Sequence, residues 1–167
     1  MRDSLEFDEF YAATSRRVLG QVYAMTGDIG AAEDAVAEAY MKAWQRWAHL
    51  RRYEVPEAWV RTVATRTAVS GWRKARNRLT AHRRAQEPDA YLHLGPDHVA
   101  LVEALRTVPS NLRQAVVLFY IADLSVAEIA AEMGAAEGTV KSWLSRARQM
   151  LRVRLDDASS VGSEGRS

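Results

Sequence analysis

The stretch Asp123 to Leu155, DLSVAEIAAEMGAAEGTVKSWLSRARQMLRVRL, decides the predicted fold. Its first part predicts a short helix, because Ser125 and Glu128 have the spacing of an S-x-x-E capping box. Gly134 stands where the end of a helix favours a left-handed residue. From Val140 onward, apolar residues recur at steps of three and four and predict a second helix. A short helix, a turn containing glycine and a second helix together predict a helix-turn-helix.

The second helix of this stretch is basic. Between Thr139 and Arg154 there are five basic residues and no acidic residue. A helix that is merely solvated usually mixes charges of both signs, so the pattern favours insertion into a DNA major groove. The alternative is an ordinary helical hairpin with a solvated basic face. Outside the apolar stripe, the helix carries Thr139, Lys141, Ser142, Ser145, Arg146, Arg148, Arg152 and Arg154.

The composition allows one domain or two small ones, since nearly half of the 167 residues are apolar. No apolar run reaches the length of a membrane span, and the acidic amphipathic start MRDSLEFDEF does not resemble a signal peptide. The chain has no cysteine, which excludes disulfides and thiolate chemistry. The absence of both cysteine and a signal peptide predicts a protein of the cytoplasm that has no contact with the membrane.

Enzymatic chemistry has no support in the sequence. The four histidines lack metal-binding spacing, and there is neither a phosphate-binding glycine loop nor a G-x-S-x-G motif. Glu33, Asp34 and Glu38 could be read as paired catalytic acids, but a solvated or partner-binding helix face explains them better. We therefore expect no enzyme activity, no cofactor and no metal site.

The distribution of charge is more informative than the net charge of +2. Residues 51–84 contain ten basic residues and two acidic ones, and the second helix of the helix-turn-helix is a separate basic zone. Two basic zones in an almost neutral chain predict two places that hold a nucleic-acid backbone.

The periodicity predicts an all-α fold of two small helical bundles joined by a flexible linker. Helices with matching apolar stripes are expected at Phe7 to Met25, Ala31 to Trp47 and Pro56 to about Arg78. They form a first domain over residues 1–78. Residues 79–97 lose the periodicity and contain two prolines and a glycine, so they are expected to be the linker.

The second bundle is expected over residues 98–155 and contains the helix-turn-helix. A short helix should run from Val99 to Val108, and Ser110 should cap the next one. In that helix the inward-facing residues are expected to be Leu112, Ala115, Val116, Phe119 and Tyr120. The remainder, residues 156–167, is polar and rich in glycine and serine, which predicts a disordered tail.

Four of the five tryptophans lie within residues 44–72 and overlap the first basic zone. Trp44 and Trp72 occupy stripe positions and are expected in the core. Trp47 and Trp59 flank the loop Ala48 to Val55, which contains arginines. Aromatic faces beside arginines can stack unpaired bases while the cations hold the backbone. Spacing alone does not decide between this role and core packing for these two residues.

Two segments resemble the small extracytoplasmic-function sigma factors of bacterial RNA polymerase, which keep only regions 2 and 4. They are AEDAVAEAYMKAW at Ala32 to Trp44 and LSVAEIAAEMGAAEGTVKSWLSRAR at Leu124 to Arg148. The resemblance covers Phe7 to Leu155. It implies a subunit that directs core RNA polymerase to promoters, reads the −35 duplex and opens the −10 element as a single strand. It also implies a possible anti-sigma protein as a partner.

Two other interpretations stay open at this point. One is a free-standing helix-turn-helix regulator that binds duplex DNA without polymerase. The other is a protein-interaction module whose basic zones are only solvated.

The resemblance assigns roles to residues of this chain. Those expected to dock on polymerase are Asp34, Glu38, Met41, Lys42 and Gln45. Those expected to bind the −10 element are Trp47, Arg51, Arg52, Tyr53, Trp59, Arg61, Arg66, Arg73 and Lys74. Those expected to bind the −35 element are Glu137, Thr139, Lys141, Ser142, Trp143, Ser145, Arg146, Arg148 and Gln149.

Some positions differ from the family pattern. Ala37 replaces a common glutamine, while Arg66 and Ser70 replace a common asparagine and aspartate. Ala136 replaces a helix-capping serine, at a cost of about 1 kcal/mol of local stability. Trp143 stands where an arginine is common, so one expected −35 contact differs.

Overall fold

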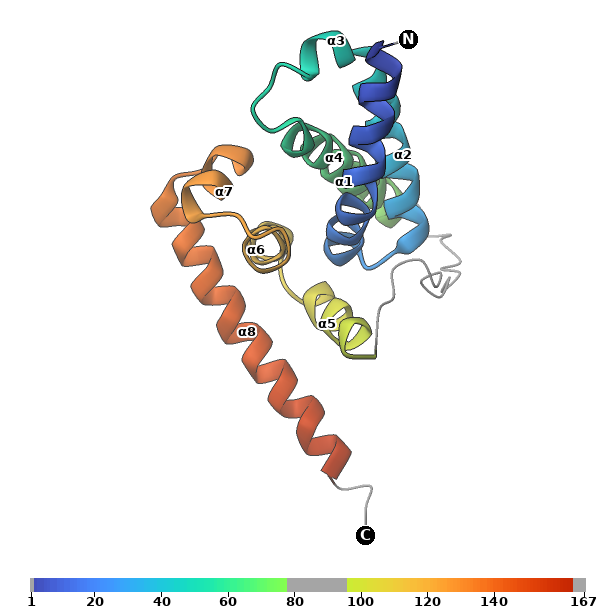
Figure 1. Cartoon of the computed structure of the whole chain (residues 1–167). Helices are drawn as coiled ribbons and strands as arrows, with labels where there is room; N and C mark the ends of the chain where they lie inside the picture. The colour runs from blue at the N-terminus through green and yellow to red at the C-terminus, as the bar shows by residue number, and fades with distance from the viewer. Residues whose placement is uncertain (1, 78–95, 164–167) are drawn as a thin grey trace. The chain divides into compact units, whose positions relative to one another are not determined.

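The computed structural model describes residues 2–77 and 96–163, with the side chains of residues 2–71 and 99–157. Every element in these residues is helical, which confirms the all-α prediction. The chain divides into two compact units, Met1–Leu94 and Gly95–Ser167 (Figure 1). Most of the expected linker lies outside the described residues.

The first unit consists of three long helices that pack against one another: α1 (Arg2–Thr26), α2 (Ile29–Gln45) and α4 (Pro56–Asn77) (Figure 1). Between α1 and α2 the chain reverses through Gly27, whose φ of 65° is left-handed. Asp28 then caps α2, because its side chain accepts a hydrogen bond of 3.0 Å from the Ala31 N–H. The core includes Val18, Val22 and Val60, all fully buried.

A short helix, α3 (Trp47–Leu50), lies where the sequence predicts a loop from Ala48 to Val55. The N–H of Leu50 donates to the Arg46 carbonyl at 2.9 Å, so a helical turn forms at once after α2 ends. Trp47 and Leu50 are both buried and hold this turn against the unit. The expectation of a plain loop is therefore wrong for its first part, and only Arg51–Val55 forms an exposed connection.

The second unit contains α5 (Pro96–Arg106), α6 (Ser110–Val116), α7 (Val126–Met133) and α8 (Glu137–Ser163). Helix α5 begins at Pro96, so the last two residues of the expected linker are helical. Ser110 is the first residue of α6 rather than its cap. The N-cap is Pro109, which has no side-chain hydrogen-bonding group.

The end of α5 is held by Arg113 of the next helix. Its guanidinium donates to the carbonyl of Arg106, the last residue of α5, at 3.3 Å and to that of Val108, just after the helix, at 3.0 Å. Burial lowers the pKa of Arg113 from its ordinary value, and the nearby charge of Arg106 acts in the same direction.

A π-helical turn, η2 (Val117–Ile121), follows α6 directly. The Ala122 N–H donates to the Val117 carbonyl at 3.0 Å, which is the wider spacing of a π-helix. This turn rotates Tyr120 outward, so that 55% of its surface is exposed. The prediction that Tyr120 faces the core is therefore wrong, because it assumed an uninterrupted α-helix.

The predicted helix-turn-helix is confirmed. The Glu128 N–H donates to the Ser125 hydroxyl at 3.2 Å, and the Ser125 N–H donates to the Glu128 carboxylate at 2.7 Å. Gly134 ends α7 with a φ of 64°. Helix α8 then runs for 27 residues to Ser163. The predicted disordered tail is thus wrong for residues 156–163, because a helix that has already formed extends without a new nucleus.

Candidate nucleic-acid and polymerase interface

Trp47 is a core residue, which decides between the two roles that spacing left open and corrects its expected place among the −10 contacts. It is 4% exposed, and its ring packs against Phe7 and Phe10 with centroids 5.1 and 5.0 Å apart. Its indole N–H finds no hydrogen-bond partner among the described residues. Helix α2 ends at Gln45, and the break at Arg46 turns the following residue inward.

Trp44 shows the opposite error. It was expected in the core, but 47% of its surface is exposed, although its ring contacts Phe7 at a centroid distance of 5.1 Å. It lies at the edge of the α2 stripe, beside the more buried Tyr40 and Ala43. An exposed indole therefore lies at the end of α2, next to the basic connection.

Arg51 faces helix α1 of its own unit. Its Nη1 donates to the Asp3 carboxylate at 2.8 Å and to the Glu6 carboxylate at 3.1 Å. The neighbouring Arg52 is exposed, and so is Tyr53, whose ring meets His49 edge-on. The connection thus exposes the Arg52 side chain to solvent and holds the Arg51 guanidinium against two carboxylates.

The residues expected on α4 do not share one surface. Arg61 is only 4% exposed, and its Nη1 donates to the Gln21 side chain at 3.5 Å. Its expected contact with DNA is therefore corrected, because it lies on the face of α4 that packs on α1. Trp59 is partly buried and Arg66 is exposed. Arg73 and Lys74 belong to α4, but their side chains lie outside the described ones.

Near its start, α4 is tied to α1 by an ion pair between Arg17 and Glu57, with N and O atoms 2.6 Å apart. Two parallel hydrogen bonds join the groups. Glu57 raises the pKa of Arg17 through these hydrogen bonds and its charge. This pair joins the start of α4, the helix that carries Arg66, to α1.

The outer face of α2 has the side chains expected of a docking surface. Four of its five expected residues recur at steps of four, three and four, and Lys42 lies beside Met41, so all five lie on one side of the helix. Glu38 and Lys42 form an ion pair one turn apart. Met41 lies among these polar groups with 55% of its surface exposed. The exposed members of the set are Asp34, Met41 and Gln45, and the partly buried ones are Glu38 and Lys42.

Helix α8 is anchored in its unit by Val140, Leu144 and Ala147, which are all buried. Since successive residues turn by about 100°, this leaves the opposite face free. Trp143 is partly buried at the border of that face. The exposed residues of the expected set are Glu137, Thr139, Lys141, Ser142, Ser145, Arg146, Arg148 and Gln149.

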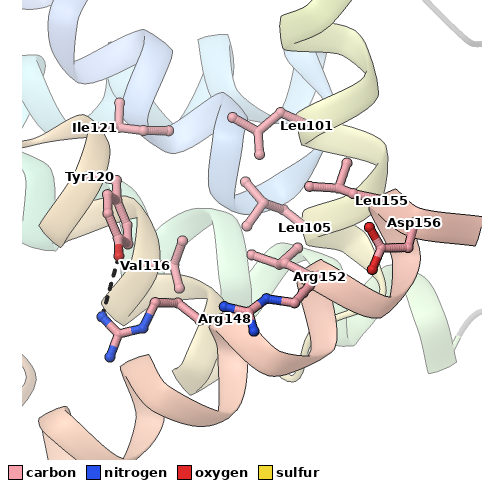
Figure 2. Close-up of a pocket in the computed structure, with 10 residues that line it drawn as sticks. Leu101, Leu105, Val116, Tyr120, Ile121, Arg148, Arg152, Leu155 and Asp156 are labelled. Carbon is pink, nitrogen blue, oxygen red and sulfur yellow. Dashed lines mark hydrogen bonds between the residues drawn. The ribbon is translucent and has the colours of Figure 1, made fainter. Parts of the chain in front are cut away.

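Arg148 of α8 reaches toward a neighbouring element. Its Nη1 donates to the Tyr120 hydroxyl at 3.3 Å, as the dashed line in Figure 2 shows. It lines an apolar groove of about 550 Å³ between α5, the π-helical turn and α8. The groove is also lined by Leu101, Leu105, Val116, Ile121, Leu151, Arg152, Leu155 and Asp156.

Some contacts of the site were not predictable from spacing. The acidic start of α1 gave no sign that Asp3 and Glu6 meet Arg51, because the partners are more than forty residues apart in the chain. The Tyr120 contact depends on the π-helical turn.

Within the described part of the chain, no helix is both long and apolar enough to cross a membrane.

Comparison with known families gives two matches in chain order. The family described as Sigma-70 region 2 matches residues 10–78, and Sigma-70 region 4 matches residues 98–151. These ranges contain the α2 face and the basic connection in one unit, and the helix-turn-helix in the other.

Individual relatives extend over nearly the whole chain. The ECF RNA polymerase sigma factor SigL of Mycobacterium tuberculosis is 32% identical over 159 residues, covering 90% of this chain and 87% of SigL. The RNA polymerase sigma-E factor of Streptomyces avermitilis is 29% identical, covering 91% of this chain and 86% of that protein.

Among solved structures, the sigma factor RpoE in complex with the anti-sigma factor NepR from Bartonella quintana matches with a TM-score of 0.77. It is 25% identical, and the match covers 90% of this chain and 97% of RpoE.

Proposed function

Because the chain belongs to the extracytoplasmic-function sigma factors of RNA polymerase, we propose that its two units contact a promoter at two separate elements. Its role is that of an RNA polymerase sigma factor, and the comparisons do not favour a regulator that acts without polymerase. The observation that carries the proposal is the pairing of the α2 face with a capped helix-turn-helix in one chain.

The second unit would read the −35 element as duplex DNA. Helix α8 enters the major groove with the face opposite Val140, Leu144 and Ala147. Ser142, Ser145, Arg146 and Gln149 lie on that face and supply hydrogen-bond donors and acceptors. Lys141 and Arg148 lie nearer the flank and would contact phosphates rather than bases. Trp143 offers an apolar contact where an arginine is common in the family.

The first unit would hold the −10 element as a single strand. Arg51, Arg52 and Tyr53 form the exposed connection that follows α3, and exposed Arg66 extends the cationic surface along α4. Base stacking is assigned to Tyr53 and Trp59. Trp47 is buried and is left out of this role. Opening the DNA duplex costs a few kcal/mol of stacking free energy per base. Binding of a flipped base by the protein would offset part of this cost. Arg73 and Lys74 remain proposed backbone contacts.

Core RNA polymerase would bind the outer face of α2. The face combines an exposed apolar residue, Met41, with acidic and basic neighbours, which suits a protein partner better than DNA. Asp34 and Glu38 would carry the electrostatic part of this contact.

The decisive test is run-off transcription with purified core polymerase on genomic fragments, with and without the protein. Specific transcripts that need the protein are the expected result. A protein that binds duplex fragments but never changes the transcripts would support the free-standing regulator instead.

A charge-reversal pair tests the α2 face. Asp34→Lys with Glu38→Lys is expected to abolish co-purification with core polymerase. The matched control, Asp8→Lys with Glu9→Lys, makes the same change of charge on α1 and should retain it. Equal loss in both variants would attribute binding to overall charge and remove α2 from the interface.

Three further features belong to the same proposal. We infer that the protein has no enzymatic activity of its own, since catalysis would reside in the polymerase, and that it acts in the cytoplasm. A protein that holds the chain inactive would be a third partner, as the anti-sigma factor NepR is found with RpoE. A candidate inhibitor should suppress run-off transcription in proportion to its concentration. Persistence of transcription at saturating inhibitor would reject that candidate.

A further inference from the structure

The ion pairs of Arg51 suggest a regulatory contact at the proposed −10 site. We propose that Asp3 and Glu6 compete with DNA phosphate for the Arg51 guanidinium, so that the start of α1 opposes binding of the single strand. This inference rests on the proposed role of Arg51 in DNA binding. It adds two residues of the first helical turns to the site.

The geometry supports competition because carboxylates and phosphates bind a guanidinium in the same way, through oxygen atoms that accept its N–H groups. Nη1 of Arg51 donates to Asp3 at 2.8 Å and to Glu6 at 3.1 Å. Asp3 and Glu6 are three residues apart in α1, so their side chains lie on the same face of the helix. A phosphate that takes this position has to displace at least one carboxylate.

The local charge adds to the effect. One guanidinium against two carboxylates leaves a net charge of −1 at this point, which repels a phosphate instead of attracting it. The basic connection as a whole remains cationic through the exposed Arg52. The acidic pair thus lowers the attraction of the free protein for any single strand, whatever its sequence.

The contact is weak enough to be reversible. Exposed fractions of the Arg51, Asp3 and Glu6 side chains are 35%, 54% and 47%, so solvent and salt screen the pairs. Exposed ion pairs of this kind change an equilibrium by about 1.4-fold to fivefold each. DNA presented by the polymerase would displace the carboxylates, whereas random single strands would be disfavoured.

The test compares Asp3→Asn with Glu6→Gln, made together, against the wild type as holoenzyme with core polymerase. The probe is a fluorescent nontemplate-strand oligonucleotide from a promoter found by run-off transcription, and the readout is anisotropy. At ~50 mM salt the double variant is expected to bind about two- to fivefold more tightly. Its salt slope should be steeper by up to about 0.7, because Arg51 then releases a counterion for its phosphate.

The matched control is Asp8→Asn with Glu9→Gln, which changes the charge of α1 by the same amount. Both residues are exposed, and neither is ion-paired with Arg51 among the described residues. Equal tightening by the two double variants would overturn the inference, because a general charge effect would explain it. Thermal unfolding by circular dichroism verifies that all variants remain folded.

A third arm repeats both double variants in an Arg51→Gln background. In that background, the Asp3 and Glu6 changes should no longer tighten oligonucleotide binding more than the control changes do. A persisting difference would overturn the inference. If Arg51→Gln alone leaves binding unchanged, Arg51 is not a DNA contact and the inference fails while the sigma-factor function stands. If no promoter yields a transcript with the wild type, the proposed function itself fails.

Discussion

At the scale of single residues, Trp44 and Trp47 show that apolar spacing does not decide burial near the end of a helix. Both tryptophans continue the apolar spacing of α2, but the helix ends at Gln45, between them. Trp47 then packs under Phe7 and Phe10, and Trp44 stays half exposed at the edge. The exposed indole near the basic connection therefore belongs to Trp44, which spacing placed in the core, whereas spacing left Trp47 undecided.

The different burial of the two tryptophans predicts that their replacement by alanine has unequal effects on stability. Trp47→Ala should lower the free energy of unfolding by about 3–5 kcal/mol, because it empties a buried site. Trp44→Ala should lower it by only about 1 kcal/mol, since its ring is already half in water. Urea denaturation followed by circular dichroism measures both. Similar losses would contradict the assignment of Trp47 to the core.

Tyr40 gives a prediction about alkaline pH. Burial raises its pKa to about 12, although the hydrogen bond with Thr14 at 2.6 Å acts in the opposite direction. The folded state thus binds this proton more tightly than the unfolded state, so its contribution is full below pH ~10 and is lost as pH rises toward ~12. The loss should be about 2–3 kcal/mol. Tyr40→Phe should remove this pH dependence.

Tyrosinate absorbance provides the measurement, with the free energy of unfolding determined in parallel. The wild type should show a tyrosinate step near pH 12, and that step should be absent from Tyr40→Phe. An unchanged titration curve would exclude Tyr40 as the source of this step.

The cations of α8 are expected to differ in their contribution to binding. Arg146 is exposed on the free face and is proposed to contact bases, so Arg146→Gln should weaken promoter binding by about 1–3 kcal/mol. Arg148 must first give up its hydrogen bond to Tyr120, so Arg148→Gln should have a smaller effect. Filter binding over a salt series compares the two variants. A larger change for Arg148 would contradict this order.

At the scale of elements, the two helices of the helix-turn-helix differ in their N-terminal caps. Helix α7 has a complete capping box from Ser125 and Glu128. At the start of α8 the Val140 N–H donates to the Ala136 carbonyl, which puts alanine in the position where a serine could cap the helix.

Exchange of these caps should move stability in opposite directions. Ser125→Ala should lower the free energy of unfolding by about 1 kcal/mol, and Ala136→Ser should raise it by a similar amount. Thermal unfolding of each variant checks this, with Ser142→Ala on the exposed face as the control. A destabilising Ala136→Ser would show that residue 136 does not cap α8.

The sequence predicts elements well where local rules act alone. The capping box and Gly134 placed the helix-turn-helix, and periodicity placed α1, α2 and α4. Errors arose where a contact or a backbone change came from elsewhere in the chain. Arg61 has the spacing of a surface cation, but its hydrogen bond to Gln21 places it on the packed face of α4. No local signal marks the π-helical turn that exposes Tyr120. Arg51 was placed on the correct connection, but its acidic partners are distant in sequence.

At the scale of the whole molecule, each unit has its own buried core. Val18, Val22 and Val60 are fully buried in the first unit, and Leu105, Leu118 and Ile129 are the corresponding residues in the second. A chain built in this way can lose the structure of one unit while the other remains folded.

This organisation predicts a local response to a core mutation. Leu118→Ala should destabilise the second unit by about 2–5 kcal/mol through the cavity that it creates. Hydrogen exchange followed by mass spectrometry should then accelerate in peptides from residues 96–163 and remain unchanged in residues 2–77. Equal acceleration in both would mean that the two units unfold as one.

The π-helical turn accommodates one extra residue between α6 and the helix-turn-helix. A π-helical turn holds one residue more than an α-helical turn at the same position. If one residue were deleted from Val117–Ile121 and the turn became α-helical, the elements after it would keep nearly the same orientation relative to α6, because the wider turn accommodates that residue. The face of α8 proposed to read the −35 element would then keep its direction, whereas the same deletion in a regular α-helical turn would rotate that face by about 100°.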